Sequence, residues 1–376
     1  MRKSTLALMA SVLAVLSSCS SDELQEHYLT SEANQIRFNV NLGRSTRADA
    51  TETTIKNLGT MNVTALVTGT DTKYIDGADY VKKGSTYTTQ DKYYWPQSGT
   101  LDFFAYGIAD GSSGQYTKTD YKTFTITPSE STSANSQIDF VYANTNAKNN
   151  KDTELPVPIN FRHAESQVNL MVKNTNKNLV FDITDWKVVY VSKSGTFTYI
   201  DEDTDGNGAA QLSKKSWSDL SKASVEDQYN HTLEKAVNIT GEAAAQKLDG
   251  SMILVPQQQP KATKYAKKGE ISKEGDPMNG AYLAVKMNIY NNDGDRTLIF
   301  NGGYACWPIE ISWAPGFRYA YIIDLASGGY HENNDDPDDP DDPDQPLDPI
   351  LSEIFFTEAS VTVDEWKDAD MIDVSM

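Results

Sequence analysis

Hydrophobic and polar residues alternate over short stretches along most of this chain, and apolar residues at helical spacing are rare. The clearest stretch is 35–42, where Ile36, Phe38, Val40 and Leu42 alternate with polar residues. Successive side chains of a strand point to opposite faces, so this pattern predicts a half-buried β-strand. We expect 35–42 to be the first strand of a sheet.

The body of the chain repeats this pattern between turn signals rich in Gly, Asp and Thr. Separate strands are predicted at 180–183, 186–191 and 195–199, a short helix at 243–247, and a hairpin around Pro315-Gly316. Recurring strands with few helical stretches favour an all-β fold of two antiparallel β-sandwich domains in tandem. The predicted parts are a signal peptide (1–18), a lipidated spacer (19–34), an N-terminal sandwich (35–165) with a cleavable loop (43–49), a C-terminal sandwich (166–330), an acidic Asp/Pro linker (331–349) and a tail (350–376).

The tail holds about one strand's worth of apolar residues after an Asp-Pro run at 335–343. Five of its residues alternate along one face: Phe355, Thr357, Ala359, Val361 and Val363. A single strand does not fold alone and needs the edge of a sheet, its own or a neighbour's. As an extended Pro-rich chain, the linker would reach about 50–60 Å, enough to bridge to a second subunit.

Composition narrows the function classes without choosing one. The net charge is −20, from 53 acidic and 33 basic residues, so nucleic acid is not an expected partner. The two cysteines are Cys19 and Cys306, and the first lies at the end of an export signal, which excludes a disulfide framework. The core must therefore be held by burial and hydrogen bonds.

The N-terminus has the pattern of an export signal. Arg2 and Lys3 precede the apolar run 6–16, which is too short to span a bilayer. The following Leu-Ser-Ser-Cys resembles the lipobox of bacterial lipoproteins, in which Cys19 would carry the lipid (palmitate) and hold the protein at the outer membrane. The acidic residues just after it are similar to the surface-export tag of Bacteroidetes lipoproteins, whereas the alternative is a plain signal peptide with a chance cysteine.

A polar segment with two arginines, Arg44 and Arg47, follows the first predicted strand. Exposed loops of this kind are where proteases cut, and a cut after either arginine would separate that strand from its domain. On the residues alone, an ordinary solvated loop is the simpler interpretation.

No stretch of the sequence has the pattern of an active site. The four histidines are scattered, and no nucleophile elbow, phosphate loop or zinc motif occurs, so no enzyme activity and no cofactor are expected. Asp201, Asp203 and Asp205 copy the start of a calcium loop, but Leu212 stands where that loop needs a bidentate Glu. We interpret this run as an acidic turn and keep it as a weak calcium candidate only.

Several segments, in order along the chain, together resemble the fimbrillin family, the type V pilins of Bacteroidetes and their Mfa-like relatives. They are Cys19 with its acidic residues, 36–38 leading to 46–48, Tyr94-Trp95-Pro96, 101–106, 161–164 with 167–168, Val255-Pro256-Gln257, and 313–316 with Tyr319 and Tyr321. No segment is specific alone, and 211–247 matches nothing in the family.

The resemblance implies two sandwich domains and assembly by strand exchange. A lipoprotein subunit would reach the cell surface, an arginine-specific protease would cut after Arg47 or Arg44, and a strand of another subunit would replace the lost 36–42. With this resemblance, cleavage becomes the preferred interpretation of the arginine loop.

The sequence therefore predicts a shaft subunit of a surface fimbria that serves adhesion, with other fimbrial subunits as partners and an unknown host or bacterial ligand. The alternative is a surface lipoprotein that binds glycans through aromatic residues such as Trp95.

Overall fold

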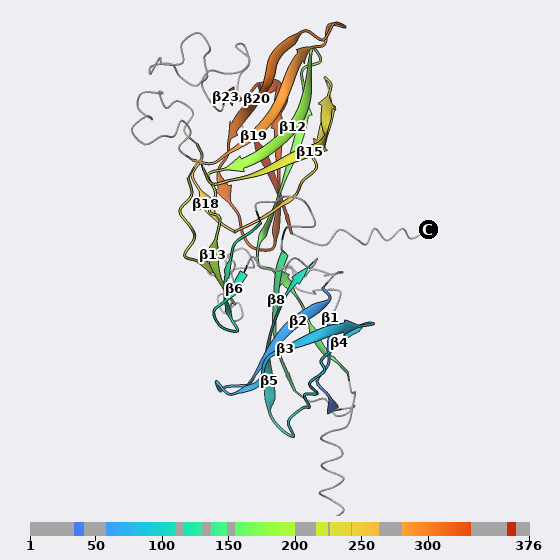
Figure 1. Ribbon diagram of the computed structural model, residues 1–376, viewed down its shortest axis with the longest axis vertical. Helices are drawn as coiled ribbons and strands as arrows, with labels where there is room; N and C mark the ends of the chain where they lie inside the picture. Colours follow the sequence, from blue (N-terminus) through green and yellow to red (C-terminus); the bar gives the residue numbers. More distant parts are fainter. Residues whose placement is uncertain are drawn as a thin grey trace, which may run out of the picture. The chain divides into compact units, whose positions relative to one another are not determined.

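The computed structural model describes residues 34–40, 58–109, 116–129, 137, 139–148, 155–199, 216–224, 226–241, 243–262, 280–331 and 359–365. Contacts divide them into two compact units: the first holds 34–40, 60–105 and 143–159, and the second holds the rest. Within these residues there are strands and one short 3-10 helix, η2 (Leu325–Ser327), but no α-helix. The all-β prediction is confirmed (Figure 1).

The first unit contains most of an eight-stranded sheet whose order is β10-β8-β5-β2-β3-β4-β1-β9; β10, the start of β8 and the end of β5 are counted with the second unit. The strands of this sheet are β1 (Phe38–Val40), β2 (Thr60–Val67), β3 (Lys73–Lys83), β4 (Thr86–Thr88), β5 (Thr100–Ala109), β8 (Asp139–Lys148), β9 (Val157–Ile159) and β10 (Arg162–His163). Strand β1 lies between β4, to which it is antiparallel, and β9, to which it is parallel. Strand β9 ends the sheet.

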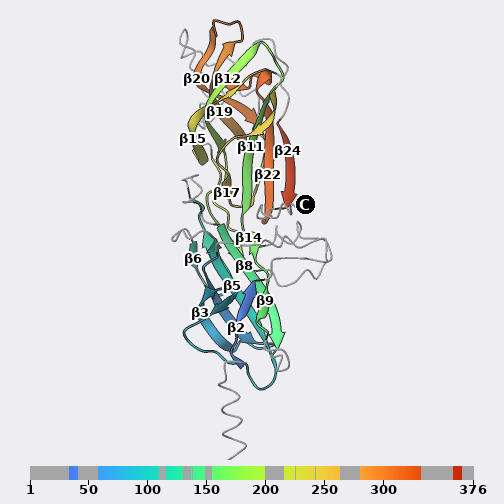
Figure 2. The same cartoon turned by 90° about the vertical axis from the view of Figure 1, so that its right-hand side faces the viewer.

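The second unit contains a sandwich of two sheets, ordered β16-β11-β22-β24 with β17 beside β11, and β15-β12-β19-β20-β23 (Figures 1 and 2). Their strands are β11 (Ser166–Asn174), β12 (Leu179–Val189), β15 (Gln228–Ile239), β16 (Ala243–Lys247), β17 (Met252–Leu254), β19 (Tyr282–Asn291), β20 (Leu298–Pro308), β22 (Phe317–Asp324), β23 (Tyr330–His331) and β24 (Ser360–Glu365). Apolar side chains of both sheets form one core, which includes Trp186 and Trp307.

Two smaller sheets complete the second unit. One has the order β14-β13-β7-β6, from β14 (Trp217–Ser218), β13 (Gly195–Thr198), β7 (Thr123–Ile126) and β6 (Tyr116–Lys118). The other pairs β18 (Gln258–Gln259) with β21 (Ile311–Ser312). Because β7 pairs with β13 along Gly195–Thr198, the second unit draws on both halves of the sequence. The domain boundary between 165 and 166 therefore stays a prediction.

Three local predictions were wrong. The stretches 180–183 and 186–191 are not separate strands, because β12 runs through both with a register shift between Ile183 and Asp185. Ile183 and Trp186 are both fully buried in the sandwich core. A β-bulge moves the inward face by one residue without ending the strand, which explains the change of phase in the sequence.

The predicted helix at 243–247 is strand β16, which pairs with β11 through Met171 and Lys247. The predicted hairpin at Pro315-Gly316 contains the turn, with φ of 74° at Gly316, but its two strands do not pair. Strand β21 pairs with β18, and β22 pairs with β11 and β24. The turn therefore carries the chain from one sheet to another. Its Gly316 amide donates to the Glu165 carbonyl (2.8 Å).

Candidate functional site

The first predicted strand lies inside a sheet, held by backbone hydrogen bonds from both sides. The Ile36 amide donates to the Tyr93 carbonyl (2.8 Å), and the Trp95 amide donates to the Asn34 carbonyl (3.0 Å). On the other side the Val157 amide donates to the Arg37 carbonyl (2.8 Å). Residues 34–40 therefore fill a slot between the β4 side of the sheet and β9.

Two side chains anchor this strand in the core. Ile36 and Phe38 have no exposed surface, as the alternation in the sequence predicts, whereas Val40 is half-buried. The Phe38 ring meets Tyr80 edge-on at 4.9 Å between centroids and Phe103 at 5.1 Å. Pairs of this geometry contribute about 0.5–1.5 kcal/mol each beyond the area that they bury. Leu42 lies outside the described residues.

The aromatic partners in the slot were not identified from the sequence. Tyr80 lies on β3 and is fully buried. Burial raises the pKa of its phenol above the usual 10.0, and the neighbouring Tyr93 adds a smaller increase. Tyr80 therefore stays neutral at physiological pH. The sequence of β3 gives no regular alternation that would mark Tyr80, because Ile75 and Tyr80 are the buried residues of this strand and its other residues are exposed or half-buried.

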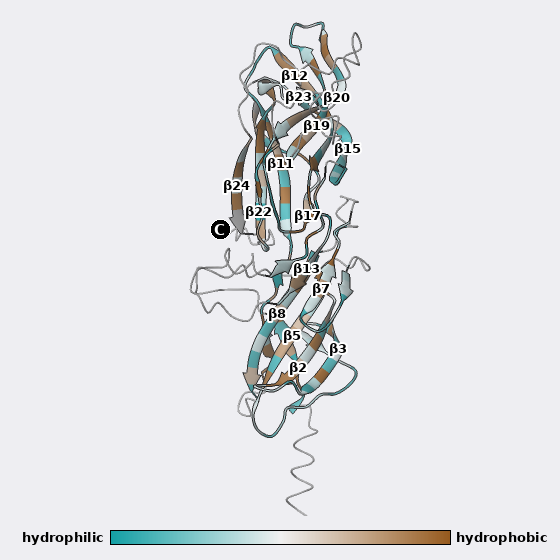
Figure 3. Ribbon diagram, turned by 90° about the vertical axis from the view of Figure 1, so that its left-hand side faces the viewer, coloured by the Kyte–Doolittle hydropathy of each residue, from teal (hydrophilic) through white to brown (hydrophobic). Residues whose placement is uncertain are grey.

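The C-terminal strand β24 lies at the edge of the sandwich beside β22 (Figure 2). The two run antiparallel, with Val361 opposite Tyr321 and Val363 opposite Tyr319. Cross-strand partners share a face of the sheet, so both valines are on the face that carries the buried tyrosines. Even so, Val361 is 45% and Val363 is 50% exposed, and β24 shows hydrophobic colour at this edge in Figure 3.

Of the other predicted tail residues, Ala359 packs against the sandwich core and is partly buried. Phe355 and Thr357 lie outside the described residues, as do Cys19, Arg44 and Arg47 and the weak calcium candidates Asp201, Asp203 and Asp205. No cluster of metal-ligating side chains occurs in the part of the chain that the structure describes. Nor is any helix there long and apolar enough to cross a membrane.

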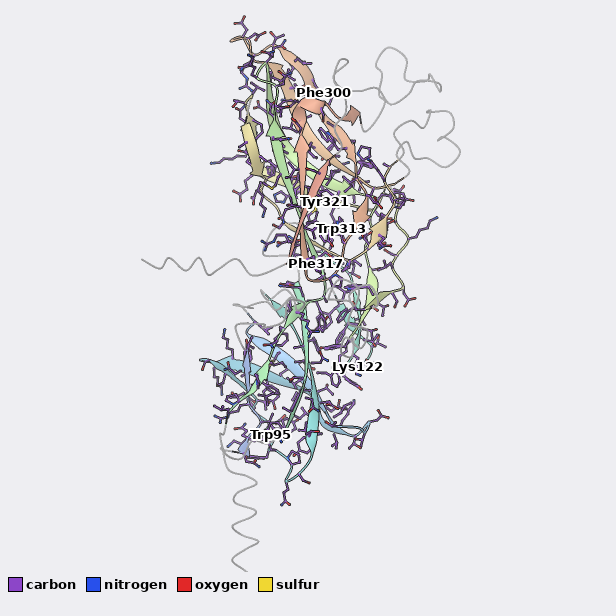
Figure 4. All side chains as sticks on the ribbon, turned by 180° about the vertical axis from the view of Figure 1, so that it is seen from behind. Trp95, Lys122, Phe300, Trp313, Phe317 and Tyr321 are labelled. Carbon is purple, nitrogen blue, oxygen red and sulfur yellow. The ribbon has the colours of Figure 1, made fainter. Side chains whose placement is uncertain are left out.

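The aromatic residue considered for glycan stacking is in the core. Trp95 is 7% exposed, and its ring meets Phe103 edge-on at 5.8 Å between centroids (Figure 4). Stacking on a sugar needs an open ring face, and this ring is covered. Trp95 therefore gives no support to the glycan-binding alternative.

Other segments singled out in the sequence are structural. Gln257 is 3% exposed, and its Oε1 accepts from the Ser192 amide (2.6 Å) while its Nε2 donates to the carbonyls of Ser192 (3.3 Å) and Val255 (3.0 Å). The Trp313 indole N–H donates to the Tyr321 hydroxyl (3.0 Å), and the two side chains lie close together in Figure 4. Such buried and paired polar groups fix connections between strands.

A buried cluster of ionisable side chains in the second unit comes from the start of β8, from β10 and from the residue just before β11. The His163 Nδ1 lies 2.6 Å from the Asp139 Oδ1, and Glu165 is fully buried with its Oε2 accepting from the Phe140 amide (2.9 Å). Burial raises the pKa of Glu165 well above its usual 4.5, the amide bond lowers it, and the charge of Asp139 raises it further. Sequence reasoning missed Glu165, because an acid beside a strand is ordinarily exposed.

Comparison with known proteins identifies the family. The fimbrillin-like family model matches residues 46–334, well over half of the chain. A fimbrial protein of Bacteroides vulgatus has a similar structure, with a TM-score of 0.51, 13% identity, and coverage of 77% of this chain and 94% of that one. Two further similar structures are a Bacteroides ovatus protein provisionally assigned to cell adhesion (TM-score 0.47, 16% identity, 88% and 96% covered) and a fimbrial assembly protein of Parabacteroides distasonis (0.34, 9%, 77% and 90%).

No curated protein sequence matches this chain. The Bacteroides vulgatus structure, at 13% identity, indicates a shared fold only, and the family model gives the assignment. The chain belongs to the fimbrillin-like family.

Proposed function

We propose that this protein is a shaft subunit of a cell-surface fimbria, assembled by strand exchange after a protease removes its N-terminal strand. Family membership supports a structural, non-catalytic role in a fimbria with other fimbrial subunits as partners. The observation that carries the finer proposal is the position of β1. It is a short strand inserted between two other strands, with Phe38 fully buried within it and Ile36 fully buried just before it, and it is followed in sequence by Arg44 and Arg47.

Removal of this strand would leave backbone groups and aromatic rings of the sheet without their partners. The carbonyl of Tyr93 and the amides of Trp95 and Val157 would lose their backbone partners, and the rings of Tyr80 and Phe103 would lose Phe38. Unpaired buried backbone groups and an open apolar slot are both costly, so a segment with alternating apolar residues would be bound in its place.

The tail is the proposed donor. Strand β24 pairs with β22 of its own chain and leaves the apolar side chains of Val361 and Val363 about half exposed. Only part of the apolar area of these side chains is buried, so this pairing retains less hydrophobic stabilisation than a strand enclosed on both sides. The acidic linker would let the tail leave this edge and reach a neighbouring subunit.

The remaining parts of the proposal concern export. Lipid on Cys19 would hold the precursor in the outer membrane until an arginine-specific protease cuts after Arg47 or Arg44. The cut would release the subunit from its anchor and open the slot in one step. Adhesion to a host or bacterial surface would then be a property of the finished fimbria.

The double substitution Arg44→Ala with Arg47→Ala is expected to abolish surface polymers and to retain lipid-anchored, full-length protein. The measurement is the N-terminal residue of the surface protein, together with the ladder of polymers on a denaturing gel. The control is Arg296→Ala, an exposed arginine of the second unit that is far from this segment in the sequence. Normal polymers from the double variant would exclude cleavage at this loop.

Deletion of 354–376 is expected to give processed subunits that do not polymerise, because the donor strand is missing. A shorter deletion, 366–376, keeps β24 and should leave polymers intact. Both are scored by electron microscopy of the cell surface and by the size of the released protein. Polymers that persist without residues 354–376 would exclude the tail as the donor.

A further inference from the structure

The β9 edge of the eight-stranded sheet has two prolines at alternate positions. Strand β9 (Val157–Ile159) contains Pro158 and is preceded by Pro156, and it is the last strand in the sheet order. Proline has no amide hydrogen, so inside a sheet it is confined to edges where its nitrogen faces solvent.

The hydrogen bonds show which way each nitrogen points. Val157 is opposite Phe38, and its amide donates to the Arg37 carbonyl at 2.8 Å, so Val157 directs its backbone groups toward β1. In a strand, successive residues direct their backbone groups to opposite sides. Pro156 and Pro158 therefore have their nitrogens on the outer side of β9, away from β1.

The outer edge of β9 consequently has no amide donor at these two positions. Pro158 is exposed and Pro156 is half-buried, so no other described strand covers the rings. A strand arriving at this edge would find carbonyl acceptors, but its own carbonyls would meet ring carbons. Edge prolines are one of the means by which proteins prevent sheets from joining edge to edge.

We propose that Pro156 and Pro158 close the β9 edge of this sheet to strand addition, so that at this end of the sheet an extended segment is accepted only in the position of β1. The excluded partner is an extended strand of a second copy of this chain. The consequence for assembly rests on the strand exchange proposed above. A free tail cannot add at the β9 edge while β1 is intact, so joining of subunits at this end of the sheet becomes conditional on the removal of that strand.

Strand β24, which ends a different sheet, differs from β9 in this respect. Strand β24 (Ser360–Glu365) reads Ser-Val-Thr-Val-Asp-Glu, with no proline and with two β-branched valines. Leu155, next to Pro156, is 70% exposed and places an apolar side chain at the β9 edge, which without the prolines would favour association. The prolines therefore lie beside an exposed apolar side chain, at an edge where association with another strand would otherwise be favoured.

The experiment uses the full-length, unprocessed protein in detergent, with β1 in place. Pro156→Val with Pro158→Val restores two outward amides with a residue that favours strands. Light scattering should show concentration-dependent dimers or larger species for this variant and monomers for the wild type. The control Pro260→Val changes an exposed proline of the second unit and should remain monomeric.

A second measurement uses a synthetic peptide with the sequence of residues 353–365. The double variant should bind it at least about tenfold more tightly than the wild type, because roughly 1.4 kcal/mol from restored hydrogen bonds corresponds to a factor of ten. Circular dichroism checks that the variants fold, and the single variant Pro158→Val provides a milder change.

Two results would overturn the proposal. One is a double variant that stays monomeric and binds the peptide no better than the wild type. The other is a wild-type protein that binds the peptide at the β9 edge while β1 is in place. Neither result depends on cleavage at the arginine loop, so a failure here is separate from a failure of the proposed function.

Discussion

Phe38→Ala is expected to lower the free energy of unfolding of the first unit by about 3–5 kcal/mol. The ring is fully buried and has edge-on contacts with Tyr80 at 4.9 Å and Phe103 at 5.1 Å. Truncation removes its apolar surface from the core and leaves a cavity, because the surrounding strands can close over it only in part. For a domain with a stability of about 5–15 kcal/mol, this loss is a large fraction.

The measurement is urea denaturation of the unprocessed protein, combined with hydrogen exchange of the amides around β1. Exchange should accelerate at Ile36 and Val157, whose amides bond across this slot. The matched control is Asn39→Ala, the next residue of the same strand, which is half-buried and should change stability by less than about 1 kcal/mol. A Phe38→Ala loss no larger than that of the control would contradict the role of Phe38 as an anchor.

The alternation of apolar and polar residues was sufficient to predict which side chains of the first strand are buried. Ile36 and Phe38 alternate with polar neighbours in the sequence and are fully buried in the structure. This works because strand periodicity is local and requires no knowledge of the partner.

Partner choice could not be predicted in this way. The turn at Pro315-Gly316 looks like a hairpin, yet β22 pairs in parallel with β11, about 150 residues earlier in the chain. The polar stretch around 228–239 shows little strand periodicity, yet it forms β15 at the edge of its sheet, where polar residues are tolerated. Alanine-rich 243–247 is a strand because tertiary pairing overrides helix propensity.

The candidate site was predicted in outline but not in its surroundings. The sequence located the strand that fills the slot. The slot itself is formed by Tyr80, Phe103 and β9, which lie in three separate parts of the chain. A bulge in β12 left a detectable signal, since the buried positions change from odd to even numbers between Ile183 and Trp186. No such signal marks the burial of Glu165.

Glu165→Gln is expected to raise stability at pH 7 to 8 by about 1–3 kcal/mol, the cost of keeping a buried polar group poorly satisfied. The carboxyl is fully buried, and its Oε1 has no hydrogen-bond partner among the described residues. Burial first, and the charge of Asp139 in addition, hold the pKa of Glu165 well above 4.5, although the Phe140 amide acts in the opposite direction. Glutamine keeps an oxygen to accept that bond and carries no charge.

The sign of the pH dependence follows from the raised pKa. The folded state prefers the protonated acid, so the wild type is most stable below the pKa of the unfolded chain, near 4.5, and loses stability as the pH rises through the folded pKa. The variant lacks this loss, so the difference between the two should be small below pH 4.5 and should grow at higher pH. Glu234→Gln, an exposed residue of β15, is the matched control and should change stability by less than about 0.5 kcal/mol at any pH.

Urea denaturation at several pH values measures this difference directly. A variant that is less stable than the wild type throughout would show that Glu165 is ionised and paired in the folded protein. Glu165 connects two parts of the second unit, since its backbone carbonyl accepts from the Gly316 amide and its carboxyl Oε2 accepts from the Phe140 amide. A protonated Glu165 would therefore tie the first residues of β8 to the turn that leads into β22, the strand on which the tail rests.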